Sequence, residues 1–360
     1  MARSQIELEN VSSLNHRNGS QPSLKDTLAM AAAWLPVGAW HTLCARPLIL
    51  PYYHLVSDET APHVRPLYRY KSVSQFKQDL EYFLAHFRPV DLDKLLKHLR
   101  HGDPLPQRGF FLSFDDGFRE TAEIVAPILK SKGVPATFFV NSAFVDNREL
   151  GLHQKAALLI GRLSKESQAG LEEKIKRLFR ERGITGDDVV STLKLMRYAD
   201  RAVLDEAAAI CDLHFDEFLQ RQKPYLTSDQ IRGLLRDGFT IGGHSVDHPF
   251  YGDLTLDEQL RQTRESVNFL RDEFGVQERA FAFPHSDDGV SRTFFERSFG
   301  DGTLQISFGT GGLLRDAWPG HFQRFSMEKT RLSPVTTVAR QYARRFFRRV
   351  AGTDLMVHPG

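Results

Sequence analysis

The sequence predicts an α/β fold, a distorted barrel of alternating strands and helices with a helical insertion. Short apolar runs recur along the chain with amphipathic helical segments between them, the pattern that builds a parallel sheet. Many of these runs end in Asp or His, and the C-terminal strand ends of such barrels are where active sites are built. The polar strand ends are His54, Asp115 with Asp116, His244, His285 and His358.

Bulk composition excludes some classes of partner and scaffold. The 360 residues carry 47 basic and 45 acidic side chains, a net charge of +2. That balance gives no case for nucleic acid as the main partner. Cys44 and Cys211 are too few for a disulfide framework, and this favours a reducing compartment.

Residues 1–46 form a predicted N-terminal extension, partly disordered because its first part is polar. The apolar run 28–40 is shorter than the roughly 20 residues that span a bilayer, and it lacks the basic start of a signal peptide. We therefore expect a buried or interfacial helix there. A cytoplasmic location is favoured, with an uncleaved membrane anchor or export as the alternatives.

The barrel is predicted to occupy residues 47–146 and 224–360, with residues 147–223 inserted as a polar, helical cap without strands. Its first part predicts strand 47–56, helix 74–86, a short strand entering an Asp-capped helix over 90–99, strand 108–114, helix 120–132 and strand 135–140. The second part predicts a helix starting at Thr227, strand 238–244, helix 255–274, strand 279–285, a weaker strand 305–309, a further segment over 323–328 and a basic helix over 334–349.

The basic helix interleaves arginines with aromatic residues, as in Arg344, Arg345, Phe346, Phe347, Arg348 and Arg349. Such a helix can contact an anionic lipid surface or a polyanionic saccharide. The ordinary alternative is a solvated face backed by an apolar face that packs on the core. A peripheral membrane contact therefore stays open, and the sequence does not indicate an oligomeric state.

Two imidazoles stand four residues apart in His244-Ser245-Val246-Asp247-His248. On one helical turn they would share a face and could bind one ion. Two histidines and a carboxylate suit Zn²⁺ with an open position for water, and the same set suits non-haem Fe(II). Spacing alone does not choose between these metals.

Ser113-Phe114-Asp115-Asp116-Gly117 followed by His244-Ser245-Val246-Asp247-His248 resembles the first two motifs of the polysaccharide deacetylases, the NodB-like or carbohydrate esterase 4 family. The resemblance covers residues 48–146 and 224–300 well and implies a distorted (β/α)7-type barrel. It implies that Asp116, His244 and His248 hold a divalent metal, Zn first, with Co, Ni or Fe as alternatives. It also implies that Asp115 is the general base.

The third motif departs from the family. Where many members carry an arginine that orients the base, this chain reads Ala282-Phe283-Pro284-His285. Ala282 cannot pair with a carboxylate, so Arg324 or a backbone donor is the candidate for orienting Asp115. Pro284 and the backbone N–H of His285 stand where the resemblance implies substrate and oxyanion contacts.

The general acid of the family is a histidine that ends the last strand. Met356-Val357-His358 fits that pattern loosely, so His358 is the first candidate, followed by His54, His321 and His285. The aspartate that tunes this histidine is not evident from the sequence, with Asp316 and Asp301 as the two candidates.

The sequence thus predicts a metal-dependent hydrolase that removes acetyl groups, N-acetyl before O-acetyl, from a saccharide. One alternative is a catalytically silent relative that binds a glycan or a lipid-linked sugar, suggested by Ala282 in place of the arginine. A second is a 2-His-1-carboxylate Fe(II) oxygenase, against which the β/α alternation counts because that chemistry usually occupies an all-β barrel.

Overall fold

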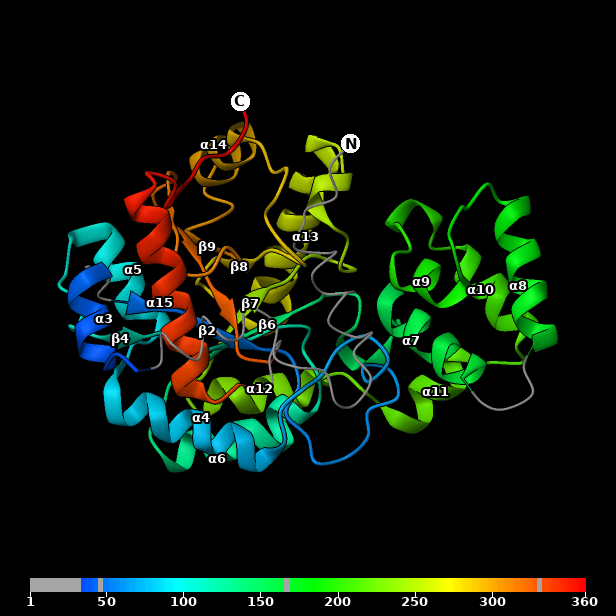
Figure 1. Ribbon diagram of the computed structural model, residues 1–360, viewed down its shortest axis with the longest axis horizontal. Helices are drawn as coiled ribbons and strands as arrows, with labels where there is room; N and C mark the ends of the chain where they lie inside the picture. Colours follow the sequence, from blue (N-terminus) through cyan, green and yellow to red (C-terminus); the bar gives the residue numbers. More distant parts are fainter. Residues whose placement is uncertain (1–33, 45–47, 165–168, 329–331) are drawn as a thin grey trace. The chain divides into compact units, whose positions relative to one another are not determined.

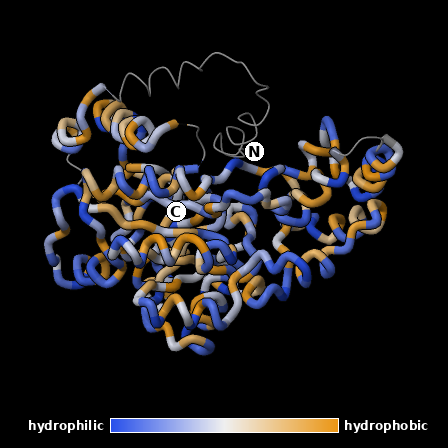
Figure 2. The backbone as a smooth tube through the Cα atoms, turned by 90° about the horizontal axis from the view of Figure 1, so that it is seen from below, coloured by the Kyte–Doolittle hydropathy of each residue, from blue (hydrophilic) through white to orange (hydrophobic). Residues whose placement is uncertain are grey.

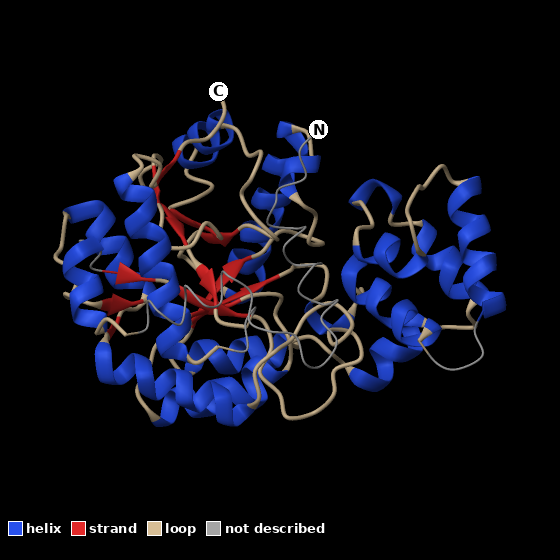
Figure 3. Ribbon diagram, in the orientation of Figure 1, coloured by secondary structure: helices blue, strands red, loops and turns tan. Residues whose placement is uncertain are grey.

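The computed structural model describes residues 34–44, 48–164, 169–328 and 332–360. The described chain packs into two compact units (Figures 1 and 3). The barrel unit comprises residues 34–58, 70–145 and 225–360, and the helical unit comprises 59–69 and 146–224. The expected disorder of the N-terminal extension concerns mainly residues 1–33, which lie outside the described part.

An eight-stranded parallel sheet forms the centre of the barrel unit, in the order β11-β9-β8-β7-β6-β5-β2-β12. The sheet is nearly closed. Its two edge strands, β11 and β12, follow each other in the chain with only Arg324 between them, and they pair with β9 and β2 respectively. The predicted α/β barrel is confirmed. Its strands are β2 (Pro51–Tyr53), β5 (Ser113–Phe114), β6 (Thr137–Val140), β7 (Thr240–Gly243), β8 (Ala280–Ala282), β9 (Ile306–Gly309), β11 (His321–Gln323) and β12 (Phe325–Ser326).

The two predicted strands at 47–56 and 108–114 each divide into halves that pair with different partners. The first halves, β1 (Leu48–Ile49) and β4 (Gly109–Phe110), join β3 (Arg88–Pro89) in a separate three-stranded sheet. The second halves, β2 and β5, pair with each other in the barrel sheet. Each predicted strand therefore changes its pairing partner along its length, and its second half leads directly to His54 or to Asp115.

Helices surround this sheet, and side-chain caps mark the start of several of them, including the predicted starts at Asp91 and Thr227. Ser72 and Thr227 each start a helix with a reciprocal capping box, and Asp91 and Thr255 each accept a backbone N–H of the first turn. Along these helices hydrophobic and hydrophilic segments alternate (Figure 2). The helices are α3 (Val37–Cys44), α4 (Val73–His86), α5 (Leu92–His101), a π-helical turn (Thr121–Val125) leading into α6 (Ala126–Ser131), α12 (Ser228–Arg236), α13 (Leu256–Phe274), α14 (Arg292–Gly300) and α15 (Pro334–Val350).

Aromatic side chains fill the barrel interior. Phe111 and Phe308 stack with ring centroids 5.1 Å apart, and Phe139 lies 5.4 Å from Phe308. A second apolar layer, containing Phe283, Phe294 and other rings, lies between the outer face of the sheet and helices α13 and α14. Side chains at successive strand positions thus enter two different environments.

Among its described residues the helical unit has five α-helices and no strand. Figure 3 draws this part of the chain as helices joined by loops. This agrees with the helical character expected for 147–223. The helices are α7 (Leu152–Leu163), α8 (Ala169–Glu181), α9 (Val189–Lys194), α10 (Val203–Ile210) and α11 (Phe215–Gln222).

The C-terminal segment departs from the prediction. The short strand β13 (Leu355–Met356) pairs in parallel with β10 (Arg315–Asp316) in a separate two-stranded sheet. His358 therefore does not end the last strand of the barrel, and that expectation is wrong. Among the described residues, none of the helices has the length and hydrophobicity needed to cross a bilayer.

Candidate active site

The Asp115-Asp116-Gly117 turn sends two neighbouring carboxylates in different directions. Asp115 still belongs to the sheet, because its N–H donates to the carbonyl of Tyr53 at 2.9 Å. Asp116 and Gly117 then adopt positive φ values of 68° and 64°. A left-handed conformation is uncommon for a residue other than glycine and is strained, and such strain concentrates at functional sites.

Asp116 meets His244 and His248. Its Oδ1 lies 3.4 Å from His244 Nε2 and 3.1 Å from His248 Nε2. The helical turn that we expected for the two histidines is wrong, because they lie in a loop after β7 with positive φ at Ser245 (71°) and His248 (65°). Ser245 Oγ accepts the N–H of His248 at 2.9 Å, and this tight turn brings the second imidazole back to the first.

The donor set of these three residues fits a divalent cation. His244 Nδ1 donates to the carbonyl of Ala282 at 2.8 Å, so the lone pair of the neutral ring is on Nε2, the atom facing Asp116. Asp116 Oδ1 is buried and accepts no hydrogen bond within the described structure. One carboxylate oxygen and two imidazole nitrogens thus converge on a point where protein donors are missing, as in a three-ligand metal site.

The pKa of Asp116 reflects the same arrangement. Burial alone would raise the pKa of this carboxyl, but the nearby imidazoles of His248 and His244 hold it well below its ordinary value. The group is therefore ionised at neutral pH and ready to bind a cation.

Asp115 makes a two-point contact with Arg324. Arg324 Nη1 donates to Oδ1 at 2.7 Å, and Nη2 donates to Oδ2 at 2.9 Å. Both groups are buried, and Nη1 also donates to Ser113 Oγ at 3.0 Å. Arg324, which the sequence analysis names as a candidate for orienting Asp115, thus contacts both oxygens of that carboxylate in the paired geometry that a guanidinium group provides.

The position of Arg324 at the junction of β11 and β12 explains this contact. Because side chains alternate along a strand, Phe322 and Arg324 share the interior face while His321 and Gln323 face outward. Inside the barrel the Arg324 guanidinium lies 4.6 Å from the ring centroid of Tyr52 and 5.3 Å from that of Phe139. These rings stabilise the buried cation and shield it from water.

His54 pairs with Glu328, a residue that the sequence analysis missed. His54 Nδ1 lies 2.6 Å from Glu328 Oε2, and the carboxylate also accepts the backbone N–H groups of His54 and Leu55. Burial would lower the pKa of His54, but Glu328, with contributions from Asp116 and Asp115, raises it to about 9. The available signal for Glu328 was its position as an acidic residue at the end of the segment 323–328.

His285 lies beside the histidine pair. Its ring centroid is 4.5 Å from that of His248, and its backbone has a positive φ of 59°. Pro284, the residue before His285, is buried just after strand β8. Pro284 and His285 therefore lie next to the cluster of Asp116, His244 and His248. The family resemblance implies substrate contacts at these two positions.

His321 and His358 belong to a second cluster, with Asp287 and Asp316. His321 Nε2 lies 3.1 Å from Asp287 Oδ2, and His358 Nε2 lies 3.1 Å from both oxygens of Asp316. The ring of Phe295 on α14 is 4.3 Å from that of His358. Because His321 faces outward from β11, this cluster lies between the sheet and α14 rather than inside the barrel.

The second cluster differs from the first because its carboxylates are supplied with protein donors. Gln323 Nε2 donates to Asp287 Oδ2 at 2.8 Å and to Asp316 Oδ2 at 3.0 Å, and the backbone N–H of Trp318 donates to Asp316 Oδ1. No oxygen of Asp287 or Asp316 is left buried without a partner in the described structure. We interpret this cluster as a hydrogen-bonded network that fastens the C-terminal segment to the barrel.

Comparison with known proteins gives consistent matches. A family model for polysaccharide deacetylase matches residues 102–296. A Bacillus subtilis protein assigned to the polysaccharide deacetylases is 30% identical over 158 residues, which are 43% of this chain and 50% of that protein, so the chain spans about half the length of this curated relative.

Two solved structures resemble the fold. A deacetylase of Streptococcus pyogenes in complex with acetate aligns with a TM-score of 0.52 and 12% identity, over 82% of this chain and 97% of that one. A de-N-acetylase from Aggregatibacter actinomycetemcomitans aligns with a TM-score of 0.50 and 13% identity, over 81% and 99% of the two chains. At these identities the structural likeness supports the barrel fold alone.

Proposed function

The chain belongs to the polysaccharide deacetylase family, and from that premise we propose that it is a metal-dependent hydrolase that removes acetyl groups from a saccharide. The observation that carries this proposal is the convergence of Asp116, His244 and His248 next to an Asp115 carboxylate that Arg324 holds by both oxygens. A metal held by the first three residues would lower the pKa of its bound water and polarise the acetyl carbonyl.

Asp115 is the proposed general base. A carboxylate has about four lone-pair sites, and Arg324 uses only one on each oxygen, so each keeps one for an attacking water. The guanidinium fixes the plane of the carboxylate, which positions it for proton transfer. After taking the proton, Asp115 remains beside a cation that can stabilise its return to the ionised form.

Arg324 also removes the reason for proposing a catalytically silent relative. That alternative rested on Ala282 in place of an arginine that orients the base. Here a guanidinium contacts the base from a different strand, 209 residues away in sequence. The hydrolase is therefore the better-supported function, and the α/β barrel disfavours the oxygenase.

His54, rather than His358, is the general acid that we propose. The general acid must be protonated at neutral pH and lie near the reacting centre. His54 meets both conditions, because its pKa is raised to about 9 and the carboxylates of Asp116 and Asp115 contribute to that rise. Its Nδ1 is engaged by Glu328, so Nε2 would deliver the proton to the leaving amine.

The backbone N–H of His285 is the proposed oxyanion donor, because the positive φ of that residue places it in a strained turn beside His248. An N-acetylated saccharide is the proposed substrate class, and Zn²⁺ the proposed metal, with Co²⁺, Ni²⁺ and Fe²⁺ as alternatives.

Acetate release from N-acetylglucosamine oligomers by the Zn²⁺-loaded protein tests this function, with O-acetylated oligosaccharides as the comparison substrate. We expect Asp115→Asn to lower kcat by about 10²- to 10⁴-fold, the usual contribution of a general base. Asp247→Asn is a control from the same histidine motif, because Asp247 accepts a hydrogen bond from Gln262 and is not one of the three proposed ligands. If Asp115→Asn released acetate as fast as the wild type, the proposed mechanism would be wrong.

A further inference from the structure

The large hydrophobic side chains that are exposed in the described structure gather in one region of the barrel unit. They lie only in α3 and the residues before it, in α15, and in the C-terminal tail 355–357. We call this region the α3–α15 surface. The exposed residues are Trp34, Leu35, Leu43, Val335, Phe347, Val350, Leu355 and Val357.

These three segments contact one another. Trp40 of α3 packs edge-on against Phe346 of α15, with ring centroids 6.3 Å apart. Arg349 Nη1 donates to the carbonyl of Leu43 at 3.4 Å. Arg345 Nη2 lies 3.5 Å from Asp354 and so links α15 to the tail.

The α3–α15 surface is also basic. Helix α15 carries five arginines and no acidic residue, and α3 carries no acidic residue either. Arg345 is buried, but Arg344 and Arg349 are exposed and Arg340 and Arg348 are partly exposed. Exposed hydrophobic side chains are thus interspersed with cations, the composition of elements that lie in the headgroup region of a bilayer.

A polar cavity of about 210 Å³ opens in this surface. It is lined by Cys44 of α3, by Arg345 and Arg349 of α15, and by Arg315 and Asp354. Three arginines against one aspartate leave an excess of positive charge there. Arginine forms paired hydrogen bonds with phosphate, so the cavity suits the phosphate of a lipid headgroup.

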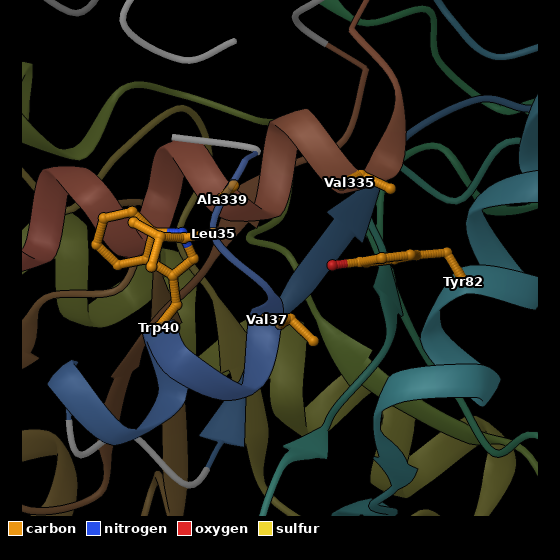
Figure 4. Close-up of a pocket in the computed structure, with 6 residues that line it drawn as sticks. All are labelled: Leu35, Val37, Trp40, Tyr82, Val335 and Ala339. Carbon is orange, nitrogen blue, oxygen red and sulfur yellow. The ribbon is translucent and has the colours of Figure 1, made fainter. Parts of the chain in front are cut away.

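The described apolar part of the surface has a notch that is too small for a protein side chain. The notch lies between α3, α15 and α4 and is lined by Leu35, Val37, Trp40, Tyr82, Val335 and Ala339 (Figure 4). The notch has a volume of about 10 Å³, which holds no more than one water molecule. Exposed hydrophobic side chains without a pocket for a partner's side chain, next to arginines, suit the headgroup region of a bilayer better than a folded partner.

We propose that the α3–α15 surface docks on a bilayer containing anionic phospholipid, with Phe347 and Val350 entering the headgroup boundary. Arg315, Arg349 and the neighbouring arginines bind headgroup phosphates. The protein is a peripheral membrane protein on this account, and a saccharide carried on a lipid becomes an accessible class of substrate.

Sedimentation with vesicles tests the proposal, using the full chain and two compositions, phosphatidylcholine alone and phosphatidylcholine mixed with phosphatidylglycerol. Each cation near an anionic surface strengthens binding about fivefold. We therefore expect Arg315→Glu/Arg349→Glu to weaken binding to the anionic vesicles by more than about tenfold. Binding is also measured over a range of salt concentrations, and Phe347→Ser/Val350→Ser should weaken it at each of them.

The matched control is Arg177→Glu/Arg180→Glu, which makes the same charge change at two exposed positions of α8 in the helical unit. It should bind as the wild type does. No binding to the anionic vesicles, equal loss in the control, or full binding by both variants of the α3–α15 surface would each overturn the proposal. So would binding to a soluble polyanion such as heparin without binding to vesicles.

Activity on a soluble oligosaccharide is measured in parallel. The α3–α15 variants should retain it, because none of these residues contacts the candidate active site. Loss of vesicle binding with normal acetate release would then show that the variants affect membrane docking and not catalysis. Absence of acetate release by the wild type would refute the proposed function without bearing on membrane docking.

Discussion

Replacing Arg324 with lysine separates its positioning role from its charge. Lysine keeps the cation opposite Asp115 but cannot donate to both carboxylate oxygens in one plane. The wild-type guanidinium makes these two contacts at 2.7 and 2.9 Å, in a fully buried setting. Removing the charge altogether, as in Arg324→Ala, would leave a buried, unpaired carboxylate and cost about 3–5 kcal/mol of stability.

The magnitude for Arg324→Lys follows from one lost hydrogen bond to a charged group, about 1.5–3 kcal/mol. If that bond holds the base in line in the transition state, kcat/KM should fall by about 10- to 100-fold, since about 1.4 kcal/mol corresponds to tenfold. The bound metal should be unchanged, because Arg324 is not among the proposed metal ligands.

Acetate release is the assay, with metal content and melting temperature measured on the same samples. Arg345→Lys is the matched control, because Arg345 is also buried but donates to the carbonyl of Leu313 at 2.6 Å and lies beside Asp354. We expect it to lose stability and keep kcat/KM. An unchanged kcat/KM in Arg324→Lys, or an equal loss in both variants, would refute the positioning role.

Three further outcomes follow from the site. His248→Ala should weaken metal binding by more than about 100-fold, measured by metal analysis after dialysis, because one of three ligands is lost; full metal content would contradict the assignment. Because Glu328 raises the pKa of His54 to about 9, the alkaline limb of the kcat/KM profile should move toward the ordinary value of 6.5 in Glu328→Gln. An unmoved alkaline limb would exclude His54 as the acid. Because the pKa of His54 is higher in the folded state than in the unfolded state, the ion pair with Glu328 stabilises the wild type fully below about pH 6.5, and this stabilisation is lost as the pH rises through about 9. His358→Ala should lower the free energy of unfolding in urea by about 1–3 kcal/mol, because Asp316 loses a buried partner, while kcat/KM stays within a few-fold; a fall of more than about 100-fold would return the acid role to His358.

The sequence alone predicted the barrel and the local parts of the site. Strand-and-helix alternation and capping residues such as Asp91 and Thr227 act over a few residues, so short windows reveal them. Asp115 and Asp116 follow a buried strand directly, but the separate directions of their carboxylates come from a turn in which Asp116 has a positive φ of 68°. Their grouping with the two histidines came from motif order and from the rule that parallel strands end at one rim.

Local reasoning was wrong where a loop replaced a regular element. The four-residue spacing of His244 and His248 fits a helical turn, but Ser245 and His248 adopt positive φ in a tight loop instead. The imidazoles still meet, because the Ser245 hydroxyl holds the turn. Residue spacing gave the correct pair for an incorrect geometric reason.

Only the tertiary structure decided which partners complete the site. Arg324 reaches Asp115 across 209 residues and Glu328 reaches His54 across 274, because the chain closes the barrel with the strand that runs from β11 to β12. His358, the sequence's first choice for the acid, lies with Asp316 outside the sheet, since its strand pairs with β10 instead of the barrel. Sheet closure and the face on which a strand residue falls are properties of the whole fold, and no local window of sequence carries them.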